Sequence, residues 1–154
     1  MNYSTPQAHI HKPRVLFVCV GNTCRSVLAE YIASCKFGKI IDVASAGLQP
    51  GMLEDTENAV FTLKTLFGVD ASQHQPRDVR SIEITTFDLV VAMTNQIFVE
   101  LMLLFPALLA ERVVKWCISD PYGGNPAQYE HCANVIYTEM KKLPLLSSNC
   151  EKDA

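Results

Sequence analysis

Short apolar segments alternate with longer amphipathic segments along this chain, and this alternation limits its fold more than any other feature. Residues 15–20 form an unbroken apolar run rich in β-branched side chains, as is typical of a strand covered on both faces. Further strands are predicted at residues 40–45, 87–93 and 113–118. Helices are predicted from Ser26 to Gly38, over residues 56–67, from the N-cap Thr94 to Phe105, and over residues 128–142. We therefore expect an α/β fold in which a four-stranded parallel sheet has helices on both faces.

The composition fits one such domain and argues against several kinds of partner. With 154 residues, 49% of them hydrophobic and 19% charged, the chain can bury one core but not two of the usual size. We expect the domain to span residues 14–144, with tails at residues 1–13 and 145–154. A net charge of −3 lacks the basic excess that is typical of nucleic-acid-binding proteins. Neither a signal-peptide core nor a membrane span is recognisable, so a cytoplasmic protein that binds no membrane is predicted.

The six cysteines are an unusually large number for this length. They stand at positions 19, 24, 35, 117, 132 and 150, without the spacing of a zinc site, so we expect neither a metal nor another cofactor. Thiols stay reduced in the cytoplasm, which leaves chemistry or burial as their roles. Cys35, Cys117 and Cys132 fall in predicted helices or strands and are expected to be core thiols, whereas Cys150 falls in the C-terminal tail.

The turn after the first predicted strand has the features of an anion-binding loop. Residues 19–26, termed the phosphate loop, read Cys-Val-Gly-Asn-Thr-Cys-Arg-Ser and lack the spacing and lysine of a Walker motif. Backbone N–H groups in such a turn, together with the N-terminus of the next helix, can hold an oxyanion. If residues 20–25 curl around a phosphate, Cys19 lies below the phosphorus and Arg25 can hold two of its oxygens. Cys19 is therefore a candidate nucleophile, the alternative being an ordinary buried thiol at a strand end.

These residues resemble the low-molecular-weight protein-tyrosine-phosphatases, and the resemblance covers nearly all of residues 14–142. Residues 19–26 match the family signature C-x-G-N-x-C-R-S, although Val27 replaces a usual proline. Three further segments follow in the family's order: Ser-Ala-Gly at 45–47, Gly-Val-Asp-Ala-Ser-Gln-His at 68–74, and Asp-Pro-Tyr-Gly at 120–123. The resemblance implies a phosphorylated protein as substrate and inorganic phosphate as product.

The resemblance also implies a two-step displacement at phosphorus that needs no metal. Cys19 would attack to form a cysteinyl-phosphate, Arg25 would hold the equatorial oxygens, and Asp120 would act first as acid and then as base. Asn22, which tolerates left-handed backbone geometry, would hold the loop shape. The positions that contact substrate or phosphate in the family correspond to Val20, Gly21, Asn22, Thr23, Cys24, Ser26 and Tyr122, and those that brace Asn22 and Ser26 correspond to Ser45 and His74.

Several of these residues have simpler interpretations when they are taken alone. Asp120 before a proline can start a turn, His74 can be a loop histidine, and Tyr122 can be a packing residue. Cys24 either forms a reversible disulfide with Cys19 on oxidation, which the family precedent favours, or is a small residue that faces the core.

Three departures from the pattern of tyrosine phosphatases leave the substrate open. Thr23 stands where an aliphatic residue is frequent, Gly123 stands where a second tyrosine is frequent, and residues 94–96 replace a frequent aspartate. These features resemble the family's bacterial protein-arginine phosphatases. We therefore expect phosphotyrosine as substrate, with phosphoarginine as the alternative.

Two further functions use the same kind of loop and are disfavoured. A thioredoxin-coupled arsenate reductase needs two more cysteines after the third strand, and residues 94–104 contain none. A phosphoprotein-binding module that is not an enzyme would not need both Cys19 and Asp120.

Overall fold

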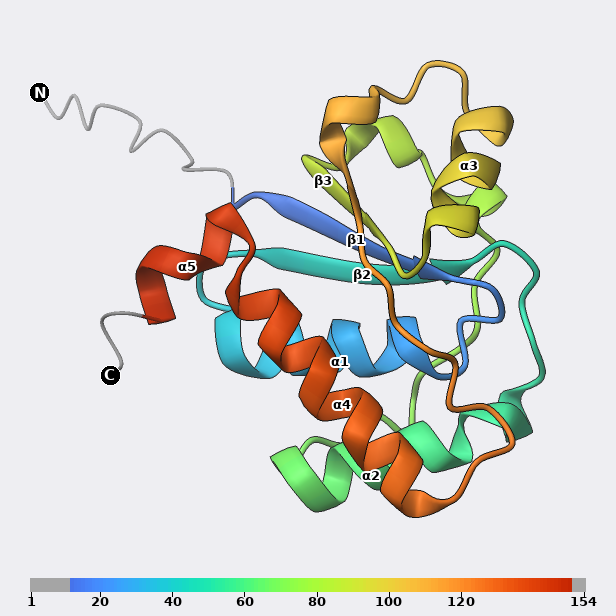
Figure 1. Cartoon of the computed structure of the whole chain (residues 1–154), viewed down its shortest axis with the longest axis vertical. Coiled ribbons are helices and arrows are strands. Elements are labelled where there is room, and N and C mark those ends of the chain that lie inside the picture. The colour runs from blue at the N-terminus through green and yellow to red at the C-terminus, as the bar shows by residue number, and fades with distance from the viewer. Residues whose placement is uncertain (1–11, 151–154) are drawn as a thin grey trace, which may run out of the picture.

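A parallel sheet of four strands forms the centre of the protein in the computed structural model, which describes residues 12–150 (Figure 1). The strands are β1 Arg14–Cys19, β2 Asp42–Gly47, β3 Leu89–Ala92 and β4 Val113–Lys115, in the order β2-β1-β3-β4. Residues 15–18 of β1 are fully buried because this strand pairs on both edges and is covered on both faces. The predicted α/β fold with a four-stranded parallel sheet is confirmed.

The helices cover the two faces of the sheet unequally. On one face lie α1 Arg25–Phe37, α2 Glu57–Phe67 and α4 Pro126–Lys141, which contact one another, and on the other face α3 Asn95–Leu104 contacts β3 and β4 (Figure 1). Thr94 Oγ1 caps α3 by accepting the N–H of Ile97, as predicted. Short 3₁₀ turns occur at Leu53–Thr56, Val79–Ser81, Ile84–Thr86 and Ala110–Arg112.

The strand order places the phosphate loop at the point where the chain changes direction across the sheet. From β1 the chain crosses to β2 on one side, and later returns to β3 on the other side of β1. The crossover connections therefore leave in opposite directions at the end of β1, which opens a crevice there. The loop occupies this crevice and leads directly into α1.

The C-terminal end of the domain differs from the expected tail. A further helix, α5 Pro144–Cys150, begins where the C-terminal tail was expected, and Leu146 is fully buried in the core. Most of the expected N-terminal tail lies outside the described residues, as does the side chain of Cys150. Within the described part of the chain, no helix has the length and apolar character needed to cross a membrane.

The expectation that three cysteines are core thiols is right for Cys132 and wrong for Cys35 and Cys117. Cys132 is buried in the core cluster. Cys117 is exposed because Trp116 and Ile118 point inward, so the alternation of an extended chain turns the residue between them outward. Cys35 is exposed because the last turns of α1 bury Ile32, Ala33 and Phe37 instead.

Candidate active site

The phosphate loop turns at Asn22, whose backbone has a φ of 55°. This left-handed geometry is costly for most side chains but is accessible to asparagine, as predicted. The side chain is fully buried: its Nδ2 donates to Ser26 Oγ at 2.8 Å and to Ser45 Oγ at 2.9 Å, and its Oδ1 accepts the N–H of Arg77 at 3.0 Å. One amide group thus joins the C-terminal end of the loop to β2 and to the segment at Arg77.

The sulfur of Cys19 lies at the end of β1, with two potential donors beside it. Its Sγ is 2.9 Å from Ser26 Oγ and 3.3 Å from the backbone nitrogen of Asn22, which donates to it. Because Ser26 Oγ already accepts a hydrogen from the Asn22 amide, its own hydrogen can point at the sulfur. Two donors beside one strand-end sulfur suit a cysteine that acts as a nucleophile.

A second set of side chains supports Asn22 from behind. Ser45 Oγ donates to Glu30 Oε1 across the interface of β2 and α1, and burial raises the pKa of Glu30. His74 Nε2 lies 3.1 Å from the backbone oxygen of Asn22. Ser45 and His74 therefore both contact Asn22, and Ser45 is linked to Ser26 through the side-chain amide of Asn22. Glu30 was not identified as a site residue, because its only sequence signal was its place just after the signature.

Arg25 is a buried cation whose hydrogen-bonding capacity is only partly used. Its Nη1 donates to the carbonyl oxygen of Ile118 at 3.0 Å, and its Nη2 lies 3.6 Å from Asp120 Oδ2. Its Nε is buried, with no partner among the described residues. The N-cap of α1, Cys24, provides no side-chain cap, so N–H groups of the first helical turn also lack an acceptor there. Unpaired donors on a buried cation and at a helix N-terminus favour binding of an anion.

Asp120 reaches this site from the loop that follows β4. Its Oδ1 accepts the N–H of Tyr122 at 3.1 Å, so the carboxylate does stabilise a turn, while its Oδ2 faces Arg25. The side chain is 48% exposed, which leaves room for a substrate atom beside it. The Asp120 carboxylate can therefore stabilise the turn with one oxygen and face the candidate site with the other.

Tyr122 lies at the rim of the site and not in the core. Its ring is 61% exposed, and its hydroxyl donates to Asp55 Oδ1 at 3.3 Å. This contact joins the Asp120 loop to the segment that follows β2. The interpretation of Tyr122 as a packing residue is wrong, because so exposed a ring contributes little to the core.

Two glycines, at the end of β2 and just after it, allow this part of the chain to approach the phosphate loop. A Cβ at Gly47 would lie 2.6 Å from the carbonyl oxygen of Val20 and 2.9 Å from the nitrogen of Asn22, so only glycine fits there. A Cβ at Gly51 would lie 3.0 Å from Cγ2 of Thr23. Thr23 is buried and therefore packs against this segment at the edge of the loop.

Cys24 points toward α4. Its Sγ lies 3.2 Å from the hydroxyl of Tyr129, and burial raises the pKa of this thiol. Tyr129 was not predicted, since it is distant in sequence and belongs to no recognised motif. The disulfide between Cys19 and Cys24 stays a prediction.

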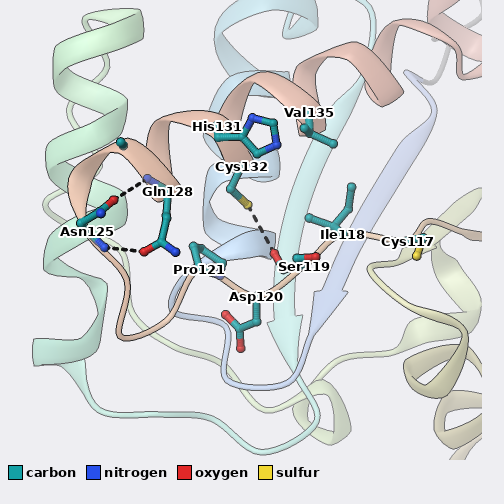
Figure 2. Close-up of a pocket in the computed structure, with 11 residues that line it drawn as sticks. Cys117, Ile118, Ser119, Asp120, Pro121, Asn125, Gln128, His131, Cys132 and Val135 are labelled. Atoms are coloured by element: carbon teal, nitrogen blue, oxygen red, sulfur yellow. Dashed lines mark hydrogen bonds between the residues drawn. The ribbon is translucent and has the colours of Figure 1, made fainter.

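A pocket of about 530 Å³ lies between the Asp120 loop and α4 (Figure 2). Ile118 and Pro121 line it from the loop, and His131 and Cys132 line it from α4. Figure 2 shows the carboxylate of Asp120 directed away from His131 and Cys132. Asp120 is thus the member of the proposed site that borders this pocket, and no residue of the phosphate loop lines it. No cluster of three or more metal-ligating side chains occurs within residues 12–150.

Fold and loop together define a class of protein. A strand-end thiol beside two donors, a buried arginine with an unused N–H and a carboxylate across the loop suit an enzyme that handles phosphate through cysteine. The sequence model described as low molecular weight phosphotyrosine protein phosphatase matches residues 14–153. The chain belongs to this family and is a phosphatase.

Comparisons with individual proteins agree on the family and include more than one activity. A low molecular weight protein tyrosine phosphatase from T. tengcongensis superposes with a TM-score of 0.75 at 31% identity, covering 91% of this chain and 99% of that one. The YwlE arginine phosphatase from Geobacillus stearothermophilus superposes with a TM-score of 0.73 at 28% identity, covering 91% and 92%. Arsenate reductase 1 from Staphylococcus epidermidis is 25% identical over 129 residues, which cover 82% of this chain and 92% of the relative.

Proposed function

We propose that this phosphatase hydrolyses phosphotyrosine in proteins through a cysteinyl-phosphate intermediate. The observation that carries the proposal is the position of Cys19 Sγ between the donors of Ser26 and Asn22, at the base of a loop whose Arg25 Nε has no other partner. This arrangement supports a nucleophile and an oxyanion site on the same loop.

The reaction proceeds in two displacements at phosphorus. In the first, the sulfur of Cys19 bonds to phosphorus while the bond to the tyrosine oxygen breaks, and Asp120 gives its proton to that oxygen. In the second, Asp120 takes a proton from water, the water oxygen bonds to phosphorus, and the sulfur leaves as thiolate. Arg25 and the loop amides hold the three equatorial oxygens in both steps. Val20, Gly21, Thr23, Cys24 and Ser26 contribute the rest of the phosphate loop.

Phosphotyrosine suits the rim of the site. The exposed ring of Tyr122 stands beside Asp120, and Met52 and Leu53, 65% and 50% exposed, follow β2 close to Asp55, to which Tyr122 is bonded. An aryl group can pack against these surfaces. Ser45 and His74 act at a distance as positioning residues for Asn22.

Phosphoarginine is the second candidate, and specific residues favour it. The similarity to an arginine phosphatase is nearly as high as that to a tyrosine phosphatase. The buried Thr23 provides a hydroxyl inside the loop, and Gly123 leaves one aromatic ring fewer at the rim. Arsenate reduction is disfavoured, because α3 contains no cysteine and burial raises the pKa of Cys132 to about 12.

The surroundings in which the enzyme acts are also part of the proposal. A net charge of −3 argues against a nucleic-acid partner, and the six cysteines suit the reducing cytoplasm. We infer that its partner is a phosphorylated protein in that compartment.

Rates on matched phosphotyrosine and phosphoarginine peptides test the proposal. We expect kcat/KM to favour phosphotyrosine, and Cys19→Ser to abolish turnover while orthovanadate still binds. Asp120→Ala is expected to slow an alkyl phosphate ester about 100-fold more than p-nitrophenyl phosphate, whose leaving group needs no proton. Turnover by Cys19→Ser would contradict the nucleophile assignment, and a preference for phosphoarginine that Thr23→Ile reverses would establish the second candidate.

A further inference from the structure

Two adjoining hollows lead from the phosphate loop along α3. The first, of about 180 Å³, is lined by Val20 and Arg25 of the loop and by α3 residues as far as Glu100. The second, of about 250 Å³, is lined by Glu100, Arg80 and Leu103, among others. Because Glu100 lines both hollows, they meet at its side chain. Together they are termed the α3 groove, whose first hollow shares Val20 and Arg25 with the phosphate loop.

The far end of the α3 groove exposes aliphatic side chains to solvent. Leu103 is 77% exposed and the adjacent Leu104 is 41% exposed, while Leu48 at the same hollow is buried. Val99, one helical turn before Leu103, is 45% exposed and extends the apolar surface. Single exposed leucines are common on protein surfaces, but several that gather at a hollow favour the binding of an apolar group.

The middle of the α3 groove carries Glu100, a carboxylate that forms no ion pair within residues 12–150. Over residues 12–150, the ion pairs join Arg25 to Asp120, Arg80 to Asp78 and Lys142 to Glu139, and none includes Glu100. Both arginines that line the groove therefore already have carboxylate partners. An unpaired carboxylate between two hollows favours a basic side chain on whatever binds there.

Helix geometry gives the spacing of these two features. Gln96 lines the first hollow together with Arg25, and along α3 Glu100 lies about 6 Å and Leu104 about 12 Å beyond it, at 1.5 Å per residue. An extended peptide advances about 3.3 Å per residue. A peptide whose phosphorylated residue occupies the phosphate loop would thus bring its second neighbour to Glu100 and its fourth neighbour to the leucines.

We propose that the α3 groove binds the substrate segment beside the phosphorylated residue. It selects a basic side chain two residues away and an aliphatic side chain four residues away. The inference rests on the proposed function, because it assumes that a phosphorylated residue occupies the phosphate loop.

A panel of phosphotyrosine peptides tests the inference. One peptide carries Arg and Leu two and four residues before the phosphotyrosine, a second carries them after it, and a third has alanine at all these positions. We expect kcat/KM for one of the first two peptides to exceed that of the alanine peptide about tenfold, the discrimination typical of a hydrophobic subsite. Equal rates on all three peptides would overturn the inference.

Variants of groove residues test whether the α3 groove is the source of the peptide preference. Leu103→Ser is expected to remove the advantage of leucine, and Glu100→Lys to replace the preference for arginine with a preference for glutamate. Leu109→Ser and Glu111→Lys are matched controls, since both residues are exposed and lie outside the groove. A loss of peptide preference that is equal in the controls would overturn the inference.

Turnover of p-nitrophenyl phosphate separates this inference from the proposed function. Leu103→Ser and the two control variants are expected to hydrolyse it at the rate of the unmodified protein, because the hollow that Leu103 lines includes no residue of the phosphate loop. If the unmodified protein hydrolyses neither p-nitrophenyl phosphate nor any phosphotyrosine peptide, the proposed function fails. If it hydrolyses both without a flanking preference, only the inference about the groove fails.

Discussion

Replacing Asn22 with alanine tests how the phosphate loop is held. The substitution removes the hydrogen bonds to Ser26, Ser45 and Arg77 and leaves their buried polar groups without a partner. Each lost bond costs about 1 kcal/mol, and more where its partner stays buried and unsatisfied. Alanine at a φ of 55° adds about 1 kcal/mol. The free energy of unfolding should therefore fall by about 4 kcal/mol, a large share of the 5–15 kcal/mol that is typical of a domain.

The effect on activity should exceed the effect on stability. The Asn22 amide donates to Ser26 Oγ and so orients the Ser26 hydroxyl hydrogen toward Cys19. Without this amide, that orientation and the defined shape of the loop are both lost. We expect kcat on p-nitrophenyl phosphate to fall about 100-fold, as after loss of one preorganised donor. Urea-induced unfolding followed by fluorescence gives the stability, and initial rates at a temperature where the variant stays folded give kcat.

Two control variants separate the contributions. Asn22→Gly removes the same hydrogen bonds but accepts the left-handed backbone, so it should be about 1 kcal/mol more stable than Asn22→Ala. Asn134→Ala, at an exposed position of α4, should change stability by less than about 0.5 kcal/mol. If Asn22→Ala were as stable as the Asn134 control, the reasoning that one amide holds the loop would be refuted.

Three other predictions follow from close packing and burial. Gly47→Ala should reduce kcat at least about tenfold, because the new Cβ would lie 2.6 Å from the carbonyl oxygen of Val20 and would displace the phosphate loop. Unchanged kinetics would contradict the conclusion that only glycine fits at this position. Leu146→Ala should destabilise the protein by about 2–5 kcal/mol in urea unfolding and Leu145→Ala by much less, whereas equal effects would argue against docking of α5. Burial raises the pKa of both Cys24 and Cys132, the latter to about 12, so at pH 7 both are protonated and iodoacetamide should spare them while it alkylates the exposed thiols. Raising the pH should increase the alkylation of both thiols, and mass spectrometry that finds either one modified before the exposed thiols would contradict this order.

The order of strands and helices was predictable because each signal is local. The apolar run before Cys19 and the helical spacing after Ser26 need only nearby residues, as does the threonine cap of α3. Boundaries were less predictable where tertiary contacts set them. The last predicted strand is shorter as β4, although the backbone N–H groups of Trp116 and Ile118 still donate to β3 and its extension at Met93.

The thiols show where local pattern fails. Cys35 and Cys117 lie in or beside regular elements and yet face solvent, because position on an element does not state which side the core occupies. Cys132 lies on the buried side of α4. The helix or strand in which a cysteine lies could be predicted from neighbouring residues. Whether its side chain points into the core depended on what packs against that element.

The sequence by itself determined the α/β fold, the family, and the thiol and guanidinium of the phosphate loop, because these depend on residue types at short spacing. Only the tertiary structure decided which distant groups complete the site. Glu30 meets Ser45, Tyr129 meets Cys24, and the carbonyl of Ile118 meets Arg25, across separations of 15, 105 and 93 residues. The α3 groove likewise exists only because β3 pairs with β1 and so brings the following helix to the phosphate loop. Such contacts follow from the strand order, which no single segment encodes.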